Sequence, residues 1–376
     1  MPKNINKYLF TSIILTAIIV LLVAVLNNYF SLRTKTLPNK LSDVIEKCLN
    51  QNYLNYYSCF RKSITPIVQT YGVNPVVLGI EQIIGGQTNR YKGFSCHDLT
   101  HIVGEVAIAA NGNLGETLIN CTKTCQYGCA HGALIGAISS HPDILNNLSS
   151  VCEPFKNSTL QDMDACNHGL GHGISEYTDM NLMKSLDFCD KITSQTAKAK
   201  CAQGVFMQVT DFPDVPFFKI TGSISDFCNS VPVDLVGACF ETASLHEYGR
   251  SKDVQKSILV CSQIPSKYRS ECVISIVNLI YANYEGSRQK LLDFCNSINP
   301  KDYNSCLKGA IEPDIIADNT ASTSIFLCNS STNKNHDTCF KMLGERYEYV
   351  YGKDRRLEFC SKLSNTLSRL CLTNEN

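Results

Sequence analysis

The sequence predicts an all-α protein, an α-solenoid of about ten disulfide-closed helical hairpins behind one N-terminal transmembrane helix. Three observations lead to this fold class. A long apolar segment stands near the N-terminus, the 20 cysteines fall into regularly spaced couples, and the couples repeat at the period of a helical hairpin. With 44% hydrophobic residues, the 376-residue chain has the composition of a folded protein.

The first element is an apolar run from Leu9 to Leu26, LFTSIILTAIIVLLVAVL, which contains eighteen residues and no charged one. A helix of this length spans the hydrocarbon core of a bilayer. No small-residue cleavage site follows the run, so the sequence predicts an uncleaved signal anchor over 9–27. The rest of the chain divides into a cytoplasmic tail, a linker and an extracytoplasmic helical-repeat domain, at residues 1–8, 28–41 and 42–376.

The cysteine content indicates the compartment. Twenty cysteines downstream of an export signal are typical of an oxidising environment, in which disulfides persist. We therefore expect a single-pass protein of the cell membrane, with the bulk of the chain extracytoplasmic. The 34 basic and 34 acidic side chains cancel, so there is no global positive field to attract nucleic acid, which is not an expected partner.

Seven couples of cysteines mark hairpins along the chain. Their members are eleven positions apart in six couples and twelve in the seventh, and each couple is expected to form a disulfide: Cys48–Cys59, Cys189–Cys201, Cys228–Cys239, Cys261–Cys272, Cys295–Cys306, Cys328–Cys339 and Cys360–Cys371. The second cysteine of a unit recurs in steps of 32 to 38 residues, which counts about ten units. Such a period is typical of helix-turn-helix arrays, whose units bury their apolar faces only by stacking.

One unit, residues 251–286, shows how the period is used. A first helix ends near Cys261, Pro265 suits the turn or the first position of the next helix, and a second helix carries Cys272 and Ile276. The two cysteines then lie about a turn either side of the bend, where antiparallel helices face each other and a disulfide fits. Each bridge closes a loop of about a dozen residues and contributes roughly 2–3 kcal/mol to stability.

The spacing is irregular only around residues 96–166. The six cysteines there are expected to form a shortened hairpin, a lengthened hairpin and a link across adjacent units: Cys121–Cys129, Cys152–Cys166 and Cys96–Cys125. The alternative is that the cysteines bind metal. The sequence contains no CxxC, however, and an even cysteine count in an exported chain favours disulfides.

Five of the eight histidines fall within 76 residues in or beside this stretch, in CHDLTHIVGE, CQYGCAHGALIG and CNHGLGHGISE. Two of these segments contain HxxxHxxxE, a spacing that places imidazoles and a carboxylate on one stripe of a helix. Such ligands suit a transition metal ion such as zinc, copper, iron or manganese, with zinc, copper or iron the expected cofactor. The predicted metal ligands are His97, His101, Glu105, His131, His168, His172 and Glu176.

The alternative is that these histidines pack between hairpins and bond to backbone carbonyls. Two copies of the motif, with His131 between them at the offset that His168 has from its own cysteine, favour a metal. Stacked helices lie about 8–10 Å apart, which puts His97 and His168 roughly 20 Å from each other in a straight array. A single ion bound by both motifs then requires a tightly curled array. Otherwise His131 completes a site with one motif, or each motif forms a site of its own.

Glycine and polar residues also recur in register with the cysteines. Glycine stands three residues after the second cysteine at Gly132, Gly169, Gly204 and Gly309. Close helix approach is the favoured explanation, and around HGLGHG the alternative is a bulky cofactor or substrate against the backbone. The residue two after that cysteine is polar in the middle units, at His131, His168, Gln203 and Glu241. We therefore expect residues 81–250 to line a functional cavity.

The alternation of short hairpins with paired cysteines over residues 42–376 resembles the Sel1-like, tetratricopeptide-related repeats of cysteine-rich secreted proteins. The resemblance implies a superhelical platform for a peptide or protein partner. Two function classes follow. One is a membrane-anchored metal-binding repeat protein, either a metalloenzyme or a metal-delivery protein. The other is a cell-surface scaffold that binds a peptide, a glycan or an envelope partner without catalysis. GxSxG, P-loop and HExxH motifs are missing from the sequence.

Overall fold

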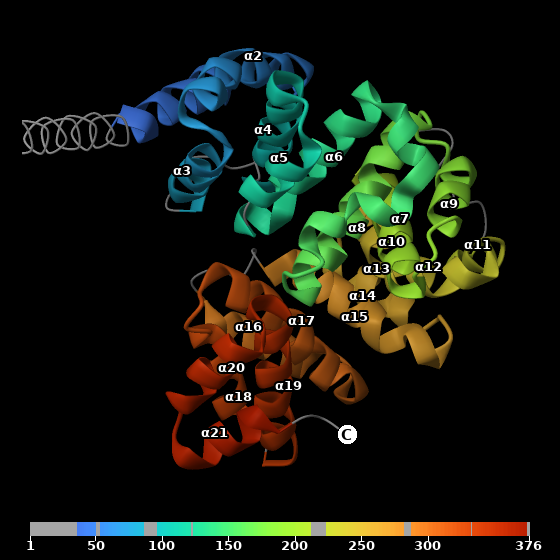
Figure 1. Ribbon diagram of the computed structural model, residues 1–376. Helices are drawn as coiled ribbons and strands as arrows, with labels where there is room; N and C mark the ends of the chain where they lie inside the picture. The colour runs from blue at the N-terminus through green and yellow to red at the C-terminus, as the bar shows by residue number, and fades with distance from the viewer. Residues whose placement is uncertain are drawn as a thin grey trace, which may run out of the picture.

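A computed structural model of the protein (Figure 1) describes residues 36–49, 53–85, 96–121, 123–211, 223–281, 287–331 and 333–373. These residues form α-helices and short 3-10 helices, and no strand occurs among them, which confirms the all-α fold class. The predicted tail, the anchor at 9–27 and the linker up to residue 35 lie outside the described residues. Within the described ranges, every helix is too short or too polar to cross a membrane.

The chain forms successive pairs of helices. A helix over 36–49 precedes the helices of the N-terminal half, which are α2 (Tyr53–Tyr71), α3 (Val73–Gly85), α4 (Cys96–Asn111), α5 (Leu114–Asn120), η1 (Thr124–Tyr127), α6 (Gly128–Ser140), η2 (Pro142–Asn147), α7 (Leu148–Val151), η3 (Glu153–Phe155), α8 (Leu160–Tyr177), α9 (Leu182–Asp190) and α10 (Gln195–Asp211). The C-terminal half contains α11 (Ile224–Asn229), η5 (Val233–Leu235), α12 (Val236–Glu241), α13 (Ala243–Ser251), α14 (Val254–Cys261), α15 (Ser266–Ile280), α16 (Arg288–Ser297), η7 (Pro300–Asp302), α17 (Tyr303–Ala317), α18 (Ser322–Ser330), α19 (Asn333–Tyr351), α20 (Lys353–Ser361) and α21 (Asn365–Leu372).

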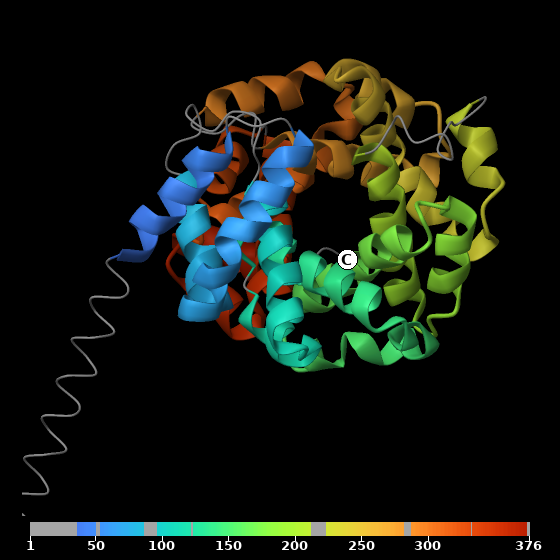
Figure 2. The ribbon, with the colours of Figure 1, turned by 90° about the horizontal axis from the view of Figure 1, so that it is seen from above.

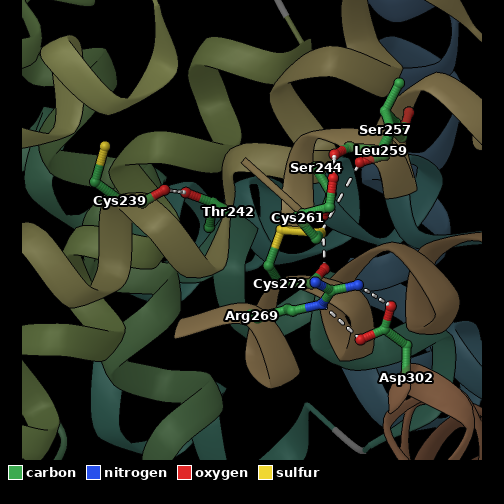
Figure 3. The surroundings of a disulfide bond; sticks show 10 residues. Cys239, Thr242, Ser244, Ser257, Leu259, Cys261, Arg269, Cys272 and Asp302 are labelled. Carbon is green, nitrogen blue, oxygen red and sulfur yellow. Dashed lines mark hydrogen bonds and ion pairs between the residues drawn. A yellow bond between two sulfur atoms is a disulfide. The ribbon is translucent and has the colours of Figure 1, made fainter. Parts of the chain in front are cut away.

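The hairpin of α14 and α15 shows how one unit is built. Asp253 caps α14, because its side chain accepts hydrogen bonds from backbone N–H groups of the first turn. Pro265 stands directly before α15, where a residue without an N–H group and with a fixed φ fits the start of a helix. The disulfide between Cys261 and Cys272 joins the end of one helix to the next, with a Cα–Cα distance of 5.7 Å (Figure 3).

Polar contacts tie this unit to both of its neighbours (Figure 3). Ser244 of the preceding unit donates a hydrogen bond of 2.7 Å to the carbonyl oxygen of Cys272. Arg269 donates two hydrogen bonds of 2.7 Å to the buried carboxylate of Asp302 in the following unit. A two-point contact between guanidinium and carboxylate restricts orientation as well as distance. The stacking of units therefore has directional restraints beyond apolar packing.

All twenty cysteines form disulfides, and the ten pairs are those predicted from the spacing. Nine bridges close a hairpin, with sequence separations of 8 to 14 residues. The tenth, Cys96–Cys125, spans 29 residues and links the start of α4 to η1. Nine bridges within hairpins and one link across adjacent units are thus confirmed as expected. This disulfide content indicates an oxidising, extracytoplasmic environment.

The helices α4, α6, α8 and α10 pack unusually closely, because glycines line their contacts. A Cβ atom on Gly132 of α6 would lie 1.8 Å from the carbonyl oxygen of His101 on α4. A Cβ atom on Gly171 of α8 or on Gly204 of α10 would lie 2.0 Å from a backbone oxygen of the other helix. Close helix approach is therefore confirmed as the reason for the recurring glycines. The alternative of a cofactor against HGLGHG is wrong, since atoms of α6 and α10 occupy that space.

The array curls until its C-terminal part packs against its middle, as two perpendicular views show (Figures 1 and 2). Tyr349 of α19 donates a hydrogen bond of 2.7 Å to Asp164 of α8, across 185 positions of sequence. Lys123, just before η1, donates a hydrogen bond to the carbonyl oxygen of Val350. The curl therefore brings units that are distant in sequence into contact near the N-terminal end of α8. Units that are neighbours in sequence still stack one after another.

Candidate metal centre

The five histidines of the irregular stretch converge in one place. His97 and His101 come from α4, His131 from α6, and His168 and His172 from α8. The ring centroid of His131 lies 5.2 Å from that of His97, 5.6 Å from His101, 5.4 Å from His168 and 5.1 Å from His172. The two rings of each HxxxH pair are 4.6 Å and 4.8 Å apart. We call these five residues the histidine cluster.

The expected separation of roughly 20 Å between the two motifs is wrong. His97 and His168 both pack against the ring of His131, so one imidazole fills the space between them. Glycine contacts account for the difference: they let α4, α6 and α8 approach more closely than the general helix spacing of about 8–10 Å. Tight curling of the array is not required to bring the motifs together.

Three members of the cluster already have the geometry of a metal site. His97, His101 and His131 can each offer one ring nitrogen such that the three nitrogens lie within 4.8 Å of one another. Zinc binds imidazole nitrogen at about 2.0–2.1 Å, so each nitrogen needs to move inward by no more than roughly 0.7 Å. Small rotations of the side chains are enough to close this triad on an ion.

Hydrogen bonds outside the cluster orient two of the imidazoles. Nδ1 of His97 lies 3.0 Å from the carbonyl oxygen of Cys125, and Nδ1 of His172 lies 2.9 Å from the side-chain oxygen of Gln208. Both partners are acceptors, so Nδ1 carries the proton in each ring and Nε2 keeps its lone pair. Histidine ligands of metal ions usually have such a partner on their second nitrogen.

Several ring nitrogens of the cluster are buried without a partner. His131 is 4% exposed, and neither of its nitrogens has a hydrogen bond to any residue that the structure describes. Nε2 of His172 is in the same situation. A buried polar group without a partner costs about 1–3 kcal/mol, so native proteins rarely keep one without a reason. A bound ion would provide that reason, because it takes up these lone pairs.

The cluster strongly disfavours positive charge. Burial lowers the pKa of His101, His131 and His168 well below the ordinary value, and repulsion by neighbouring basic groups, mostly the other histidines, lowers it further. Burial also lowers the pKa of His172 to about 4, although the bond to Gln208 opposes the shift. These four imidazoles are therefore neutral at pH 7, the state in which histidine binds a metal ion.

Neither predicted carboxylate belongs to the triad of His97, His101 and His131. Glu105 accepts a hydrogen bond of 2.5 Å from the hydroxyl of Tyr57 and forms an ion pair with Arg61, both on α2. Glu176 is exposed near the end of α8. In HxxxHxxxE, the glutamate lies one helical turn, about 6 Å, from the nearer histidine and two turns from the other. Two turns are too far for the glutamate to share one ion with both histidines. Within the described ranges, the triad of His97, His101 and His131 forms without them.

Some residues of the site were not predicted from the sequence. Gln208 on α10 is 5% exposed in the structure. In the sequence it is a polar residue within an apolar stretch, which is the one signal that could have identified it. The role of Cys125 resides in its carbonyl oxygen, which any residue type could supply. Arg61 and Tyr57 belong to the first units, outside the stretch of residues 81–250 that was expected to carry function.

The predicted polar row continues beyond the cluster. Gln203 of α10 donates a hydrogen bond to Glu241 of α12, and Lys308 of α17 forms an ion pair of 3.4 Å with Glu271 of α15. Burial raises the pKa of Glu241, and the Gln203 amide lowers it in part. His246 on α13 is partly buried and has a pKa lowered by burial. Within the predicted row, Gln203 and Glu241 of successive units thus pair with each other.

Comparison with known proteins adds no relative. No protein family, no curated protein and no solved structure matches this chain. The repeated hairpins with their disulfides are consistent with the Sel1-like architecture, and the interpretation of the site depends on its geometry.

Proposed function

We propose that the protein is an extracytoplasmic metal-binding protein, which holds a transition metal ion through the histidine cluster. His97, His101 and His131 are the ligands of this ion. The observation that carries the proposal is the convergence of five imidazoles. Three of them offer nitrogens within 4.8 Å of one another, and the central one, His131, is buried with both nitrogens unpartnered among the described residues.

The ligand set favours particular metals. Imidazole nitrogen suits zinc, copper, iron and nickel, whereas calcium and magnesium prefer oxygen ligands. All cysteines are in disulfides, so no thiolate competes for the ion. Three protein ligands also leave a coordination position for water, the arrangement of catalytic zinc sites. The same site therefore suits either a metalloenzyme or a protein that stores and delivers the ion.

Metal analysis of the full-length protein tests the proposal. The chain is purified with its disulfides intact, incubated with Zn²⁺ or Cu²⁺, desalted and measured by elemental analysis. We expect at least one ion per chain, and one ion fewer per chain in the variant His97→Gln/His101→Gln. His141→Ala is the matched control, since His141 ends the same helix as His131 but is exposed and outside the cluster.

Circular dichroism of the variants checks that the fold is retained. A folded wild-type chain without stoichiometric zinc or copper at pH 7.5, tested also with Fe²⁺ under anaerobic conditions, contradicts the proposal. That outcome favours the second function class, a scaffold whose surface binds a peptide or protein partner.

The location of the site is part of the proposal. The apolar run at 9–26 supports an anchor that holds the domain at the outer face of a membrane. The ten disulfides support an oxidising compartment for the domain. Extraction of membranes with alkaline carbonate tests the anchor: the full-length chain is expected in the pellet, and a chain without residues 1–35 in the supernatant.

A further inference from the structure

We propose that His131 bridges two metal ions, so that the histidine cluster is a dinuclear site. His97 and His101 complete the first position, and His168 and His172 complete the second. This inference rests on the metal-binding function proposed above and specifies how many ions the cluster holds.

The placement of His131 is the first argument. Its helix, α6, packs between α4 and α8, and its ring centroid lies 5.1 to 5.6 Å from those of all four other histidines. Measured between ring centroids, the two pairs flank His131 at equal range, one on each neighbouring helix. Measured between nitrogens, the side of His97 and His101 is already within 4.8 Å, so the second position closes by rotation of the His168 and His172 rings.

The hydrogen bonds of the cluster are the second argument. His97 and His172 each have an outer acceptor for Nδ1, the carbonyl of Cys125 and the side-chain oxygen of Gln208. Nε2 of His97 lies 3.0 Å from Nε2 of His101, a contact that an ion between the two nitrogens would replace, and Nε2 of His172 has no partner among the described residues. His131 has no such acceptor among the described residues, and both of its nitrogens are buried. A ligand to one ion would keep a buried, unpaired N–H on its second nitrogen. A bridging ligand uses both.

The second position has its own prepared ligand. Nε2 of His172 is buried without a partner, and Gln208 holds the opposite side of the ring. The ring of His168 lies 4.8 Å from that of His172. Gly169, between them on α8, lets the backbone approach the ring of His131, because a Cβ there would be 2.7 Å from Cδ2 of that ring. An ion bound only by His97, His101 and His131 would not account for the placement of His168, His172 and Gln208.

The chemistry of a bridge can be written explicitly. A neutral imidazole has one lone pair and one N–H. The first ion binds the lone pair of His131. The second ion binds the other nitrogen after its proton leaves for the solvent, so the ring becomes an imidazolate shared by two cations. Loading of the second ion therefore releases a proton from His131, and no oxidant or reductant takes part.

Copper titration of the full-length protein, followed by electron paramagnetic resonance, tests the bridge. The first equivalent of Cu²⁺ is expected to give the signal of an isolated ion. The second is expected to reduce the total signal, because two Cu²⁺ ions couple antiferromagnetically through an imidazolate. Calorimetry in buffers of different ionisation enthalpy is expected to show one additional proton released with the second ion.

Variants separate the bridge from simple binding. His168→Gln/His172→Gln is expected to bind one equivalent with an uncoupled signal, and His131→Gln is expected to lose the coupling. His141→Ala is the control that keeps two coupled ions. The wild-type titration alone can overturn the bridge, since saturation at one equivalent or two additive signals exclude it whether or not a variant folds.

The outcomes distinguish the two proposals. Saturation of the wild-type chain at one equivalent, or two equivalents whose signals simply add, overturns the bridge and leaves the metal-binding function standing. Absence of binding overturns both. Two equivalents with a diminished signal that recovers in His131→Gln establish the bridge.

Discussion

The side-chain oxygen of Gln208 on α10 accepts a hydrogen bond of 2.9 Å from Nδ1 of His172 on α8. This contact selects the tautomer of His172 and leaves its Nε2 available for an ion. We expect Gln208→Ala to lower the affinity for the second Zn²⁺, the ion assigned to His168 and His172, by about 10- to 100-fold, the usual loss when an outer partner of a histidine ligand is removed. Competition with a chromophoric chelator measures the change.

Gln161→Ala is a matched control for that experiment, because Gln161 is equally buried at 5% exposed but bonds to Glu312 on α17. It is expected to bind zinc like the wild type. Equal affinities of Gln208→Ala and the wild type would show that Gln208 has no part in the site.

Replacement of Gly132 by alanine is expected to separate α4 from α6. The added methyl group meets the backbone of His101 at 1.8 Å, where no side-chain rotation can relieve the overlap. Overpacking of this kind costs about 1–3 kcal/mol or more. We expect lower stability in chemical denaturation, together with loss of metal binding.

Gly115→Ala provides the comparison. A methyl group there meets other atoms only at 3.7 Å, and alanine is the better helix former, so stability is expected to stay equal or rise. A Gly132→Ala chain as stable as the wild type would contradict the close contact between the two helices.

The metal-free protein is expected to lose stability as the pH falls from about 6.5 toward 4. The folded state holds His172 with a pKa of about 4, below the ordinary 6.5, so the unfolded state binds the proton first. The contribution of neutral His172 to the free energy of unfolding is fully present above pH 6.5. It declines below that pH and is smaller by about 3 kcal/mol at pH 4. Burial lowers the pKa of His101, His131 and His168 in the same direction.

Urea denaturation at pH 7, 5.5 and 4.5 measures this dependence. Glu241, whose pKa is raised by burial, acts in the opposite sense, so the comparison is made against His172→Gln. The wild type is expected to lose more stability than the variant between pH 7 and 4.5. Equal slopes would contradict a neutral, buried His172.

The Cys96–Cys125 cross-link is expected to support the metal site as well as the fold. The carbonyl oxygen of Cys125 accepts the hydrogen bond from His97, so the cross-link positions an outer partner of the first ion. Cys96→Ser/Cys125→Ser should weaken zinc binding and remove about 3–4 kcal/mol of stability. Chelator competition and denaturation measure the two effects.

Removal of Cys360–Cys371, which closes a hairpin at the C-terminal end, is the control. It is expected to lower stability and leave zinc affinity unchanged. Unchanged affinity in both double variants would assign the cross-link a purely structural role.

The repeat was predictable because its determinants are local. A hairpin closed by Cys261 and Cys272 brings together residues eleven positions apart, and Pro265 between them marks the bend. Spacing along the sequence is enough to identify such a pair. The leftover pair, Cys96 and Cys125, followed by elimination once the regular couples had been assigned.

The metal site depends on distances between helices, which the sequence determined only in part. The sequence identified the five histidines and the recurring glycines, but a general helix spacing placed His97 and His168 much too far apart. Tertiary structure decided that His131 fills the space between them, because Gly132 and Gly169 allow backbone contact on both sides of α6. It also placed Gln208 of α10 beside His172 and paired Glu105 with Arg61 and Tyr57. Hydrogen-bond partners depend on which helices meet, and spacing along the sequence does not determine that.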